Sequence, residues 1–516
     1  MSIDSTTRAV VEPRLRNLFK ERLVLAAESK NQDSIYGRDL WPITLLWQKA
    51  NDTPYPADFI VWPETEKEII DLISICREYK IPLVPYAGGS GVCGGTVPVY
   101  GGIICDVKRM DKIIELNEKN LTCTVEPGMN GQLFEEYLNR HGYTLGHFPS
   151  SIYVSTVGGW VATRAAGQLS TYYGKIEDMV LNLKMVLGNG ETVETLPAPA
   201  SAQGPDFNQI FIGSEGVLGI ITSVTFKIHV YPKKRGFFAV KAKDVTQGIE
   251  FMRQVMREEL KPAAVRLYDE LDTAIIGSPE EKNDSNSESG TGYKAILKSL
   301  KEGKGLTTIL RFAGLTNRAA NIGLKFLNAG CLLLFTFEGP EELVATQLHL
   351  IEKLALDNQL DIKGEKPAEY WWNHRYDVSY NSPSVIKAGA FLDTCEVATT
   401  WDKLADLYFN VKNAVQDEVF IMAHFSHSYL NGNNIYFSIV GFADSYEESK
   451  KKYFRVWDKM MKVCLDMNVA ISHHHSIGLL KQEYLKKQLG NKLPIWKSIK
   501  QACDPDNIMN PGKMGV

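Results

Sequence analysis

Hydrophobic and polar positions between residues 57 and 143 form short apolar runs separated by amphipathic stretches. The run FIVWP at 59–63 predicts a strand. The next stretch, ETEKEIIDLISICREYK at 64–80, predicts a helix because its isoleucines and leucines recur at helical spacing. IPLVPY at 81–86 predicts a second strand. Beyond a glycine-rich stretch, the pattern predicts strand, strand and helix in GGIICDV, CTVEPG and FEEYLNRHGY. This rhythm indicates a mixed αβ domain of two layers.

The pattern changes near residue 231. There, TSVTFKIHVYPKK (222–234) has the period-two alternation of a strand that ends in a proline turn. We therefore expect a domain boundary near residue 235. The stretch SPEEKNDSNSESGTG at 278–292 is polar and nearly free of apolar residues, which predicts a surface loop. The last stretch, CDPDNIMNPGK at 503–513, predicts an irregular tail that folds back on the protein.

Composition and charge narrow the class of protein. A chain of 516 residues is too long for one ordinary core, so we expect two or three domains. Hydrophobic residues make up 44% and charged residues 23% of the chain, which excludes a largely disordered protein. The formal net charge is -4, and charges of both signs are interspersed, so no basic stripe could follow a phosphate backbone. Nucleic acid is not an expected partner.

Eight cysteines are spread along the chain without a C-x-x-C pair, which favours free thiols in a reducing compartment over a zinc, iron–sulfur or dithiol site. The first residues are charged, and no stretch holds about 18 uninterrupted apolar residues. The final residues, GKMGV, are not the peroxisomal Ser-Lys-Leu signal. We expect a cytoplasmic protein with at most peripheral membrane contact. A homodimer and an electron-acceptor protein stay open as partners.

A glycine cluster, PYAGGSGVCGGTVP at 85–98, directly follows a predicted strand. Glycines at this density let successive backbone N–H groups point into one concavity, which binds phosphate oxygens. A flexible turn is the alternative interpretation. Gly89, Gly91 and Gly94 match G-x-G-x-x-G, but no helix start follows, so the stretch is not a Rossmann fingerprint. It is not a Walker loop either, because no Gly-Lys-Ser/Thr follows.

Two later stretches combine small hydroxyls with bare backbone. In the first, STVGG at 155–159 precedes WVATRAAG, which predicts the start of a short helix. Hydroxyl donors at a helix start favour a diphosphate or a flat ring with many acceptors. The second is IFIGSEGVLGIIT at 210–222. Loops of this kind can together hold one elongated ligand.

In this order, PYAGGSGVCGG, TVEPG, STVGGWVATRAAGQLSTYYGKIEDMV and GSEGVLGIIT resemble the FAD-binding domain of the FAD-linked oxidases, the vanillyl-alcohol oxidase family. The resemblance spans residues 55–230 and returns in the C-terminal tail. It implies an α+β fold with FAD as cofactor. The expected parts are an N-terminal extension at 1–54, a two-subdomain PCMH-type FAD-binding domain at 55–235, an α/β cap or substrate domain at 236–465, and a returning segment at 466–516.

The resemblance also implies which residues bind FAD. The loop from Pro85 would cradle the diphosphate, STVGG would lie along the flavin, and the stretch from Gly213 would reach the adenine side. The residues placed on FAD in this way are Pro85, Tyr86, Ala87, Gly88, Gly89, Ser90, Gly91, Val92, Pro149, Ser150, Ser155, Thr156, Gly158, Gly159, Thr163, Glu215, Gly216, Gly219 and Ile220.

Members of the family that attach FAD covalently use a histidine in the diphosphate loop, and this chain has Ser90 there. We therefore expect noncovalent FAD. Cys93 offers a thioether link as an alternative, but a small buried loop residue is the preferred interpretation.

Within that family, both halves of the chain resemble alkyl-dihydroxyacetonephosphate synthase, in runs that include PSSIYVSTVGGWVATRAAGQ, VRLYDE, HFSHSYLNGNNIYFS and ISHHHSIG. The resemblance implies that a tyrosine, a histidine and an arginine meet the flavin face. The matching positions are Tyr429, His474 and Arg266, and Arg375 matches the arginine of a Trp-x-x-x-Arg segment. Histidine and tyrosine suit the removal or return of a proton near neutral pH.

Three adjacent histidines, His473 to His475, raise the question of a metal site. Related 2-hydroxy-acid dehydrogenases carry H-x-G-D-G-N-x-H and a later glutamate as metal ligands. Here HFSHSYLNGNN keeps His424 and His427 but lacks the Asp-Gly-Asn core, and HHHS stands where those enzymes have Glu-His-Gly. We therefore predict that no metal is bound.

One departure bears on the substrate. The synthase pattern continues to a second arginine in a Tyr-x-Arg-Asp run, but residues 380–383 here are Tyr, Asn, Ser and Pro. A phosphate favours bidentate guanidinium groups, so this difference argues against acyl-dihydroxyacetonephosphate.

We expect a flavoenzyme that acts on a small or lipid-like oxygenated substrate, by redox chemistry or by the acyl-to-alkoxy exchange that makes ether lipids. The alternatives are a 2-hydroxy-acid dehydrogenase that passes electrons to a quinone or flavoprotein, and a noncatalytic FAD-binding protein.

Overall fold

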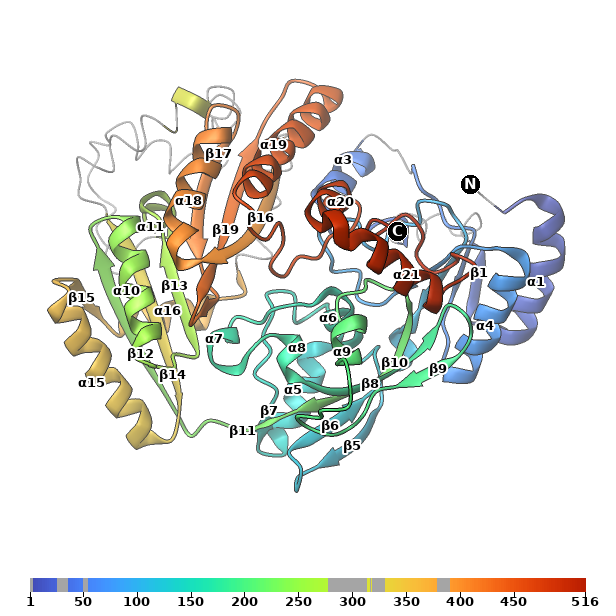
Figure 1. Ribbon diagram of the computed structural model, residues 1–516, viewed down its shortest axis with the longest axis horizontal. Coiled ribbons are helices and arrows are strands. Elements are labelled where there is room, and N and C mark those ends of the chain that lie inside the picture. Colours follow the sequence, from blue (N-terminus) through green and yellow to red (C-terminus); the bar gives the residue numbers. More distant parts are fainter. Residues whose placement is uncertain are drawn as a thin grey trace. The chain divides into compact units, whose positions relative to one another are not determined.

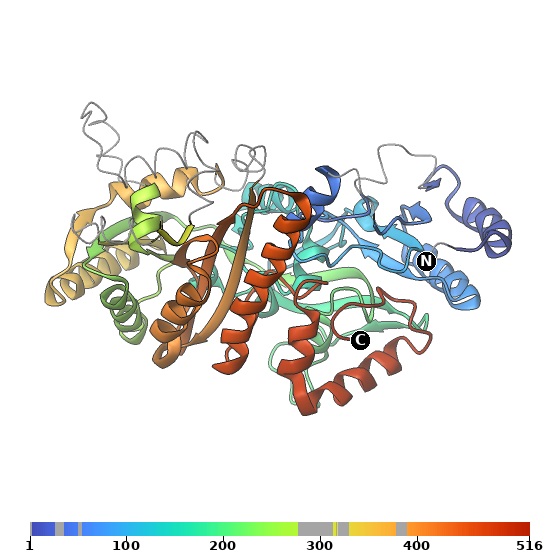
Figure 2. The same ribbon diagram turned by 90° about the horizontal axis from the view of Figure 1, so that it is seen from above.

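The computed structural model describes residues 3–25, 36–49, 54–276, 313–315, 317, 330–377 and 390–516. The predicted polar loop at 278–292 lies outside these residues. The chain divides into two compact units; Figure 1 labels most of their elements, and Figure 2 shows the same ribbon from above. The first unit comprises Met1–Gly167, Gly174–Tyr231 and His474–Val516. The second comprises Gln168–Tyr173 and Pro232–His473.

The first sheet of the first unit has the strand order β1-β2-β4-β3, in which β2, β4 and β3 are parallel and β1 is antiparallel to β2. The glycine cluster follows the end of β3. The elements of this subdomain are β1 (Leu23–Leu25), β2 (Phe59–Val61), β3 (Leu83–Tyr86), β4 (Ile103–Asp106), η2 (Val107–Arg109), α1 (Ser5–Phe19), α3 (Pro42–Lys49) and α4 (Glu66–Tyr79).

Helix α4 forms where the 3.6-residue spacing predicts it. The Thr65 hydroxyl accepts a hydrogen bond from the backbone N–H of Glu68, which caps the helix N-terminus. The apolar face of α4 packs into the core through Ile69 and Leu72, both fully buried. The helix ends at Tyr79 because Lys80 adopts the left-handed conformation, with φ 54°.

The second sheet of the first unit is antiparallel, with the order β5-β6-β10-β8-β9. A separate two-stranded ribbon pairs β7 with β11. The elements are β5 (Ile113–Asn117), β6 (Thr122–Val125), β7 (Tyr143–Thr144), β8 (Val180–Leu187), β9 (Thr192–Glu194), β10 (Gly219–Lys227), β11 (His229–Val230), α5 (Gly131–Arg140), α6 (Val157–Thr163), α8 (Ile176–Met179) and α9 (Phe207–Phe211).

The C-terminal segment consists of α20 (Gln482–Leu489), η4 (Gly490–Lys492) and α21 (Leu493–Cys503), followed by an irregular tail. The tail returns to the first sheet as predicted, because Met509 forms a parallel bridge with Leu83 of β3. The backbone N–H of Leu83 donates to Ile508 O at 2.8 Å, and that of Asn510 donates to Leu83 O at 2.8 Å. The last residues of the chain therefore pair with the strand that leads into the glycine cluster.

The second unit is built on one antiparallel sheet with the order β15-β12-β14-β13-β17-β19-β16, and β18 pairs with β19. Its elements are α7 (Ser170–Tyr173), β12 (Lys234–Ala242), α10 (Val245–Arg257), β13 (Ala264–Tyr268), α11 (Glu270–Ile276), β14 (Cys331–Gly339), α15 (Glu341–Asp357), β15 (Asp361–Gly364), α16 (Lys366–His374), β16 (Phe391–Thr400), α18 (Trp401–Val415), β17 (Phe420–Phe425), β18 (Ser428–Tyr429), β19 (Gly432–Gly441) and α19 (Tyr446–Asp466).

Four helices cover one face of this sheet. Phe251 of α10 packs edge-on against Phe335 of β14, and Tyr408 of α18 stacks on Phe437 of β19. A Cβ at Gly236 of β12 would lie 2.7 Å from Val344 of α15, so α15 lies on the same face. Helix α19 joins them, since Tyr453 and Trp457 both donate hydrogen bonds to Asp393 of β16. The apolar side chains of this face form the core of the second unit.

The opposite face of the sheet is partly apolar and partly polar. Ala368 and Trp371 of α16 pack on an apolar cluster over β12, β14 and β13. Strand register places polar side chains on the rest of the face, because Tyr268 pairs with His424, His424 with Tyr436, and Tyr436 with Glu396. We call the following set the polar sheet face: Arg266, Tyr268, His424, Asn434, Tyr436 and Glu396.

None of the helices in the described ranges is long and apolar enough to span a bilayer. All eight cysteines fall within those ranges, and they are buried thiols without disulfide bonds. The cellular compartment stays a prediction.

His147 predicts a specific pH dependence of stability. Its imidazole is fully buried against Trp160, and neither ring nitrogen has a hydrogen-bond partner among the described residues. Burial lowers the pKa of His147 from 6.5 to about 3, and Lys175 adds repulsion. Between these values the unfolded chain binds a proton that the folded chain does not. Stability from this group is therefore complete above pH 6.5 and is lost as the pH falls toward 3.

We expect His147 to lower the free energy of unfolding by about 1.4 kcal/mol for each unit by which the pH falls in that window. His147→Phe keeps the ring contact with Trp160 and removes the titrating group. The measurement is the unfolding midpoint of both proteins, followed by circular dichroism from pH 7 to pH 4. As the pH falls, the midpoint of wild type should decrease more than that of the variant. Parallel pH profiles would contradict the assignment.

Candidate functional site

The glycine cluster lies directly against other glycine-bearing motifs of the first unit. A Cβ at Gly88 would lie 2.4 Å from the carbonyl oxygen of Val154, so the two loops touch through bare backbone. A Cβ at Gly216 would lie 2.8 Å from Pro85 Cγ, which puts the GSEG stretch beside the end of β3. Motifs more than 120 residues apart in sequence therefore meet at one place.

The first half of the glycine cluster presents hydrogen-bond donors. Residues 87–92 are half-buried. Within the described ranges, the backbone N–H groups of Gly88 to Val92 have no acceptor. Two buried oxygens near the loop, Thr96 Oγ1 and Asn510 Oδ1, also lack a partner there. Unsatisfied groups of this kind are costly unless a ligand or water satisfies them, so their concentration here indicates a polar ligand.

Gly89 has a conformation and a position that only glycine tolerates. Its φ is +59°, and a Cβ would lie 2.0 Å from the hydroxyl oxygen of Tyr86. Tyr86 is itself held in place by a ring contact with Tyr36 at 4.8 Å between centroids. Any side chain at Gly89 would therefore displace either the loop or a buried tyrosine.

The STVGG stretch first serves to start helix α6. The Thr156 hydroxyl accepts from the backbone N–H of Gly159 at 3.3 Å and caps the helix, so α6 begins at Val157, three residues before the predicted start. The Ser155 hydroxyl accepts from the indole N–H of Trp160 at 2.8 Å, which leaves its own proton available to a ligand.

Several predicted cofactor residues have local packing or hydrogen-bonding roles. A Cβ at Gly158 would lie 2.5 Å from Pro127, and one at Gly219 would lie 2.3 Å from the oxygen of Val186 in β8. The Ile220 side chain lies in the hydrophobic core, so only its backbone could face a ligand.

Three further predicted positions differ in hydrogen bonding and exposure. Thr163 donates to Gly159 O at 2.8 Å inside α6. Pro149 is buried and Ser150 is exposed.

Asp39 of the N-terminal extension is a site residue that sequence reasoning missed. Its Oδ2 accepts hydrogen bonds from the backbone N–H groups of Gly94 and Gly95, at 2.9 and 3.1 Å. Burial raises the pKa of Asp39 to about 7, although these N–H groups act to lower it. The only signal in the sequence is an acidic residue inside the apolar stretch YGRDLWP.

Glu215 was predicted near the adenine, and its carboxylate binds the segment that follows the histidine triplet. One oxygen accepts from the backbone N–H of Ile477 at 2.7 Å and the other from that of Gly478 at 2.8 Å. Burial raises the pKa of Glu215, and Lys513 and Lys481 oppose this shift. The carboxylate therefore ties the GSEG stretch to residues 477 and 478.

The C-terminal tail completes this part of the first unit. Lys513 is fully buried and donates to Val97 O at 2.6 Å, and burial lowers its pKa to about 8. The Asn510 amide donates to Gly95 O at 2.9 Å and to Glu215 O at 2.7 Å. These contacts join segments more than 290 residues apart, and no local pattern in the sequence predicts them.

In the second unit, Tyr429 is paired with a histidine. The hydroxyl of Tyr429 lies 2.8 Å from His473 Nε2. The His473 ring stacks on His427 with 4.9 Å between centroids and 26° between planes. His427 Nδ1 in turn lies 2.6 Å from the hydroxyl of Ser170, in the short segment that belongs to this unit. A phenol, two imidazoles and a hydroxyl thus form one connected group.

Glu396 of the polar sheet face holds the histidine segment from the other side. It is fully buried and accepts hydrogen bonds from the Ser472 hydroxyl at 2.8 Å and from the backbone N–H of His473. The bridge between Ala398 and Ala470 aligns this segment with β16. The His473 ring is therefore positioned through its backbone as well as through its stacking contact.

The predicted middle histidine, His474, belongs to the first unit, where its ring contacts His475 edge-on at 4.4 Å. Within the second unit, the histidine bonded to Tyr429 is His473. The catalytic role of His474 stays a prediction.

Both predicted arginines lie in the second unit beside tryptophans of α16. The Arg266 guanidinium lies 4.9 Å from the Trp371 ring, and its buried Nε has no hydrogen-bond partner in the described part of the chain. Arg375 follows α16 and lies 3.9 Å from the Trp372 ring, whose other cationic neighbour is Arg235 at 3.8 Å. Stacking on an indole leaves the edge of a guanidinium available for an anion.

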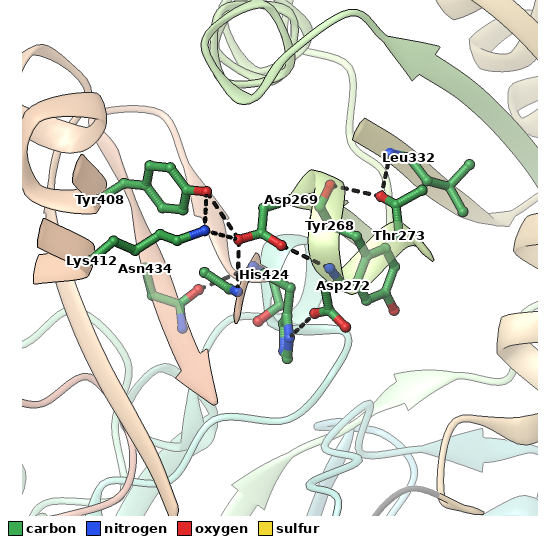
Figure 3. Close-up of polar contacts among 11 residues, drawn as sticks. Tyr268, Asp269, Asp272, Thr273, Leu332, Tyr408, Lys412, His424 and Asn434 are labelled. Carbon is green, nitrogen blue, oxygen red and sulfur yellow. Dashed lines mark hydrogen bonds and ion pairs between the residues drawn. The ribbon is translucent and has the colours of Figure 1, made fainter. Parts of the chain in front are cut away.

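A buried acidic pair supports the polar sheet face, as Figure 3 shows. Asp269 is fully buried and accepts hydrogen bonds from Tyr408, Lys412 and the backbone N–H of Ala423. Its neighbour Asp272 lies 3.3 Å from His424 Nδ1. Burial lowers the pKa of His424, which Asp272 partly opposes. The neutral His424 ring then stacks on Tyr436 of the same face.

The prediction of no bound metal stays a prediction. His427 and His473 each offer a ring nitrogen, and the two nitrogens lie within 4.8 Å of each other.

Comparisons with known proteins agree on the class of protein. Residues 57–196 match the profile of an FAD binding domain, and residues 231–514 match the C-terminal domain of FAD linked oxidases. Alkyldihydroxyacetonephosphate synthase of Dictyostelium discoideum is 28% identical over 470 residues, which cover 89% of this chain and 73% of that protein. The mitochondrial D-lactate dehydrogenase [cytochrome] of Arabidopsis thaliana is 27% identical over 476 residues, which cover 91% and 74%.

A solved structure of alkyldihydroxyacetonephosphate synthase has the same fold, with a TM-score of 0.75 and 24% identity over 98% of this chain and 84% of that one. The predicted fold class is confirmed. The family matches indicate that the cofactor is FAD. The free N–H groups of Gly88 to Val92, together with the buried oxygens of Thr96 and Asn510, fit a ligand with a diphosphate and many polar atoms. Noncovalent attachment stays a prediction.

Gly89→Val should sharply reduce FAD retention. Valine is strained at φ +59°, and its Cβ would collide with Tyr86, so the diphosphate loop must move. Strain of this size corresponds to a loss of affinity of about tenfold or more. The measurement is the ratio of flavin to protein absorbance after gel filtration.

The matched control is Gly142→Val. Gly142 also has a positive φ, +83°, but a Cβ there would meet nothing within 4 Å. This variant should keep its flavin. Full FAD occupancy in Gly89→Val would show that the loop does not approach the cofactor closely.

Proposed function

Because this chain belongs to the FAD-linked oxidases and is a FAD-dependent enzyme, we propose that the polar sheet face of its second unit binds a small or lipid-like oxygenated substrate. The observation that carries the proposal is the hydrogen bond between Tyr429 and His473. It provides a proton donor and acceptor in the unit whose sheet also presents Arg266.

The bound flavin would supply the capacity to accept or return electrons. The residues that would hold it are those of the loops at 85–92, 155–159 and 215–220. Their contribution is backbone donors and close approach, which suit a diphosphate and a flat ring.

Tyr429 and His473 would move the proton that accompanies this chemistry. A phenol bonded to an imidazole can pass its proton to the ring nitrogen at 2.8 Å and recover it, and an imidazole does this near neutral pH. His427 and Glu396 keep the His473 ring in place.

Arg266 would recognise the anionic part of the substrate. Its buried Nε has no partner among the described residues, and Trp371 supports the plane of the guanidinium. One edge of a guanidinium can donate two parallel hydrogen bonds to a carboxylate.

Two reactions fit this arrangement. The synthase relative supports an ether-lipid type exchange on a lipid-like substrate. The D-lactate dehydrogenase relative supports oxidation of a 2-hydroxy acid with electron transfer to a separate acceptor. The absence of an arginine at residues 380–383 favours a substrate carboxylate over a phosphate. Arg266 provides a single guanidinium, which suits a carboxylate. Residues 380–383 lie outside the described ranges.

Anaerobic mixing with substrate candidates tests the proposal. A 2-hydroxy acid that bleaches the flavin absorbance would support the dehydrogenase. An alkyl-ether product from a fatty alcohol and an acylated ketose phosphate, detected by mass spectrometry, would support the synthase. If neither panel produces bleaching or product in a flavin-loaded protein, the proposed substrate class is wrong.

Tyr429→Phe and His473→Ala should each lower turnover by about a hundredfold to ten-thousandfold while FAD content stays at the wild-type level. The loss follows from removing one partner of the proton pair, and single-turnover flavin reduction measures it. His474→Ala tests the resemblance-based assignment beside them. His349→Ala, an exposed histidine of α15, is the control and should leave turnover unchanged. Wild-type reduction rates in the first two variants would remove the pair from the mechanism.

A further inference from the structure

The N-terminal extension contributes to the diphosphate loop, although it lies outside both matched family regions, which begin at residues 57 and 231. Asp39 reaches the second half of the glycine cluster and accepts the N–H groups of Gly94 and Gly95 through a single carboxylate oxygen. Its other oxygen accepts from the backbone N–H of Trp41 at 3.0 Å. The side chain is 3% exposed, so these bonds form away from bulk water.

The contact between the extension and the loop has three parts. Besides the carboxylate bonds, the backbone N–H of Leu40 donates to Gly91 O at 2.8 Å. The indole of Trp41 lies so close to Gly94 that a Cβ there would be 2.7 Å from Cε3. Gly94 also has a positive φ of 78°, so the loop bends at the point where Asp39 and Trp41 hold it.

These bonds divide the donors of the loop into two groups. The N–H groups of Gly94 and Gly95 are turned toward Asp39, and those of Gly88 to Val92 stay without an acceptor in the described ranges. Strand β3 fixes the loop at one end, and Asp39 fixes it at the other. A glycine-rich segment loses much conformational entropy when it is ordered, so ordering it in advance lowers the cost of ligand binding.

Charge around Asp39 is compatible with an anionic ligand nearby. Lys513, from the C-terminal tail, faces both Asp39 and Glu215 and interacts electrostatically with each. Tyr86 of β3 also faces Asp39, and burial raises the pKa of this phenol, which keeps it uncharged. The lysine offsets carboxylate charge that would otherwise repel a diphosphate.

We propose that Asp39 is a positioning residue for FAD, which presets the diphosphate loop by binding the N–H groups of Gly94 and Gly95. The inference concerns the cofactor and does not depend on which substrate the enzyme uses. It assigns to the N-terminal extension a part in cofactor retention.

The test is the rate at which the holoenzyme releases FAD. Asp39→Ala should release flavin about tenfold to a hundredfold faster than wild type, because a buried pair of hydrogen bonds is lost and the loop must be ordered by the ligand. Release is followed by the rise of free-flavin fluorescence after dilution. Circular dichroism of the same samples checks that the fold is retained.

Asp58→Ala is the matched control. Asp58 is also 3% exposed in the first unit, and it accepts the backbone N–H of Gly102 at 2.9 Å and that of Ile3 at 3.1 Å. Its loss removes a comparable buried carboxylate away from the diphosphate loop. We expect a lower unfolding midpoint with an unchanged rate of FAD release.

Equal acceleration of release in both variants would show that the effect is general destabilisation and would overturn the proposal. A wild-type release rate in a folded Asp39→Ala would do the same. If Asp39→Ala does not fold, Asp39→Asn decides. The single carbonyl oxygen of asparagine can accept either from Gly94 and Gly95 or from Trp41, but not from both sides. FAD release should therefore be faster than in wild type and slower than in Asp39→Ala. A wild-type rate would reject the proposal.

Discussion

Buried backbone N–H groups in irregular segments need hydrogen-bond acceptors. In the first unit, buried carboxyl groups act as these acceptors. Asp39 accepts from Gly94 and Gly95, and Glu215 accepts from the segment after the histidine triplet. Burial raises the pKa of both carboxyl groups, and the bonds from the N–H groups oppose this shift by stabilising the ionised form. The cofactor loop keeps its shape through these hydrogen bonds. Lys513 lowers the free-energy cost of burying the two carboxyl groups, because it places a positive charge near both.

A second constraint is the register of the large antiparallel sheet. A slip of one residue would turn every side chain to the other face, so the register decides whether polar groups lie under the four helices or on the opposite face. Asp269 ties β13 to β17 through the Ala423 N–H, and this contact aligns Tyr268 with His424. A structural carboxylate thereby places an imidazole on the face where Arg266 lies.

Each unit contributes a different part of the chemistry. The first provides backbone donors and bare glycines, which suit a large cofactor with many acceptors. The second provides titratable and cationic side chains, which suit proton transfer and anion recognition. The Tyr429–His473 pair is held from two directions. Glu396 of β16 binds the backbone N–H of His473, and Ser170 contacts the His427 ring that stacks on His473. Precise placement matters more for a proton donor than for an apolar contact.

The spacing of apolar residues was enough to predict β2, α4 and β3, because helix and strand periodicity depends only on residues close together in sequence. The family resemblance predicted which loops bind FAD, and their contacts with the cofactor stay a prediction. The residue pattern alone placed the start of α6 too late, at Trp160, since Gly158 and Gly159 are typical of a loop, whereas Thr156 caps a helix that begins at Val157. The partners of Asp39 lie 55 residues away and that of Ser170 lies 257 residues away. Such pairs form only when the chain folds and buries them together, so the tertiary structure alone decided them.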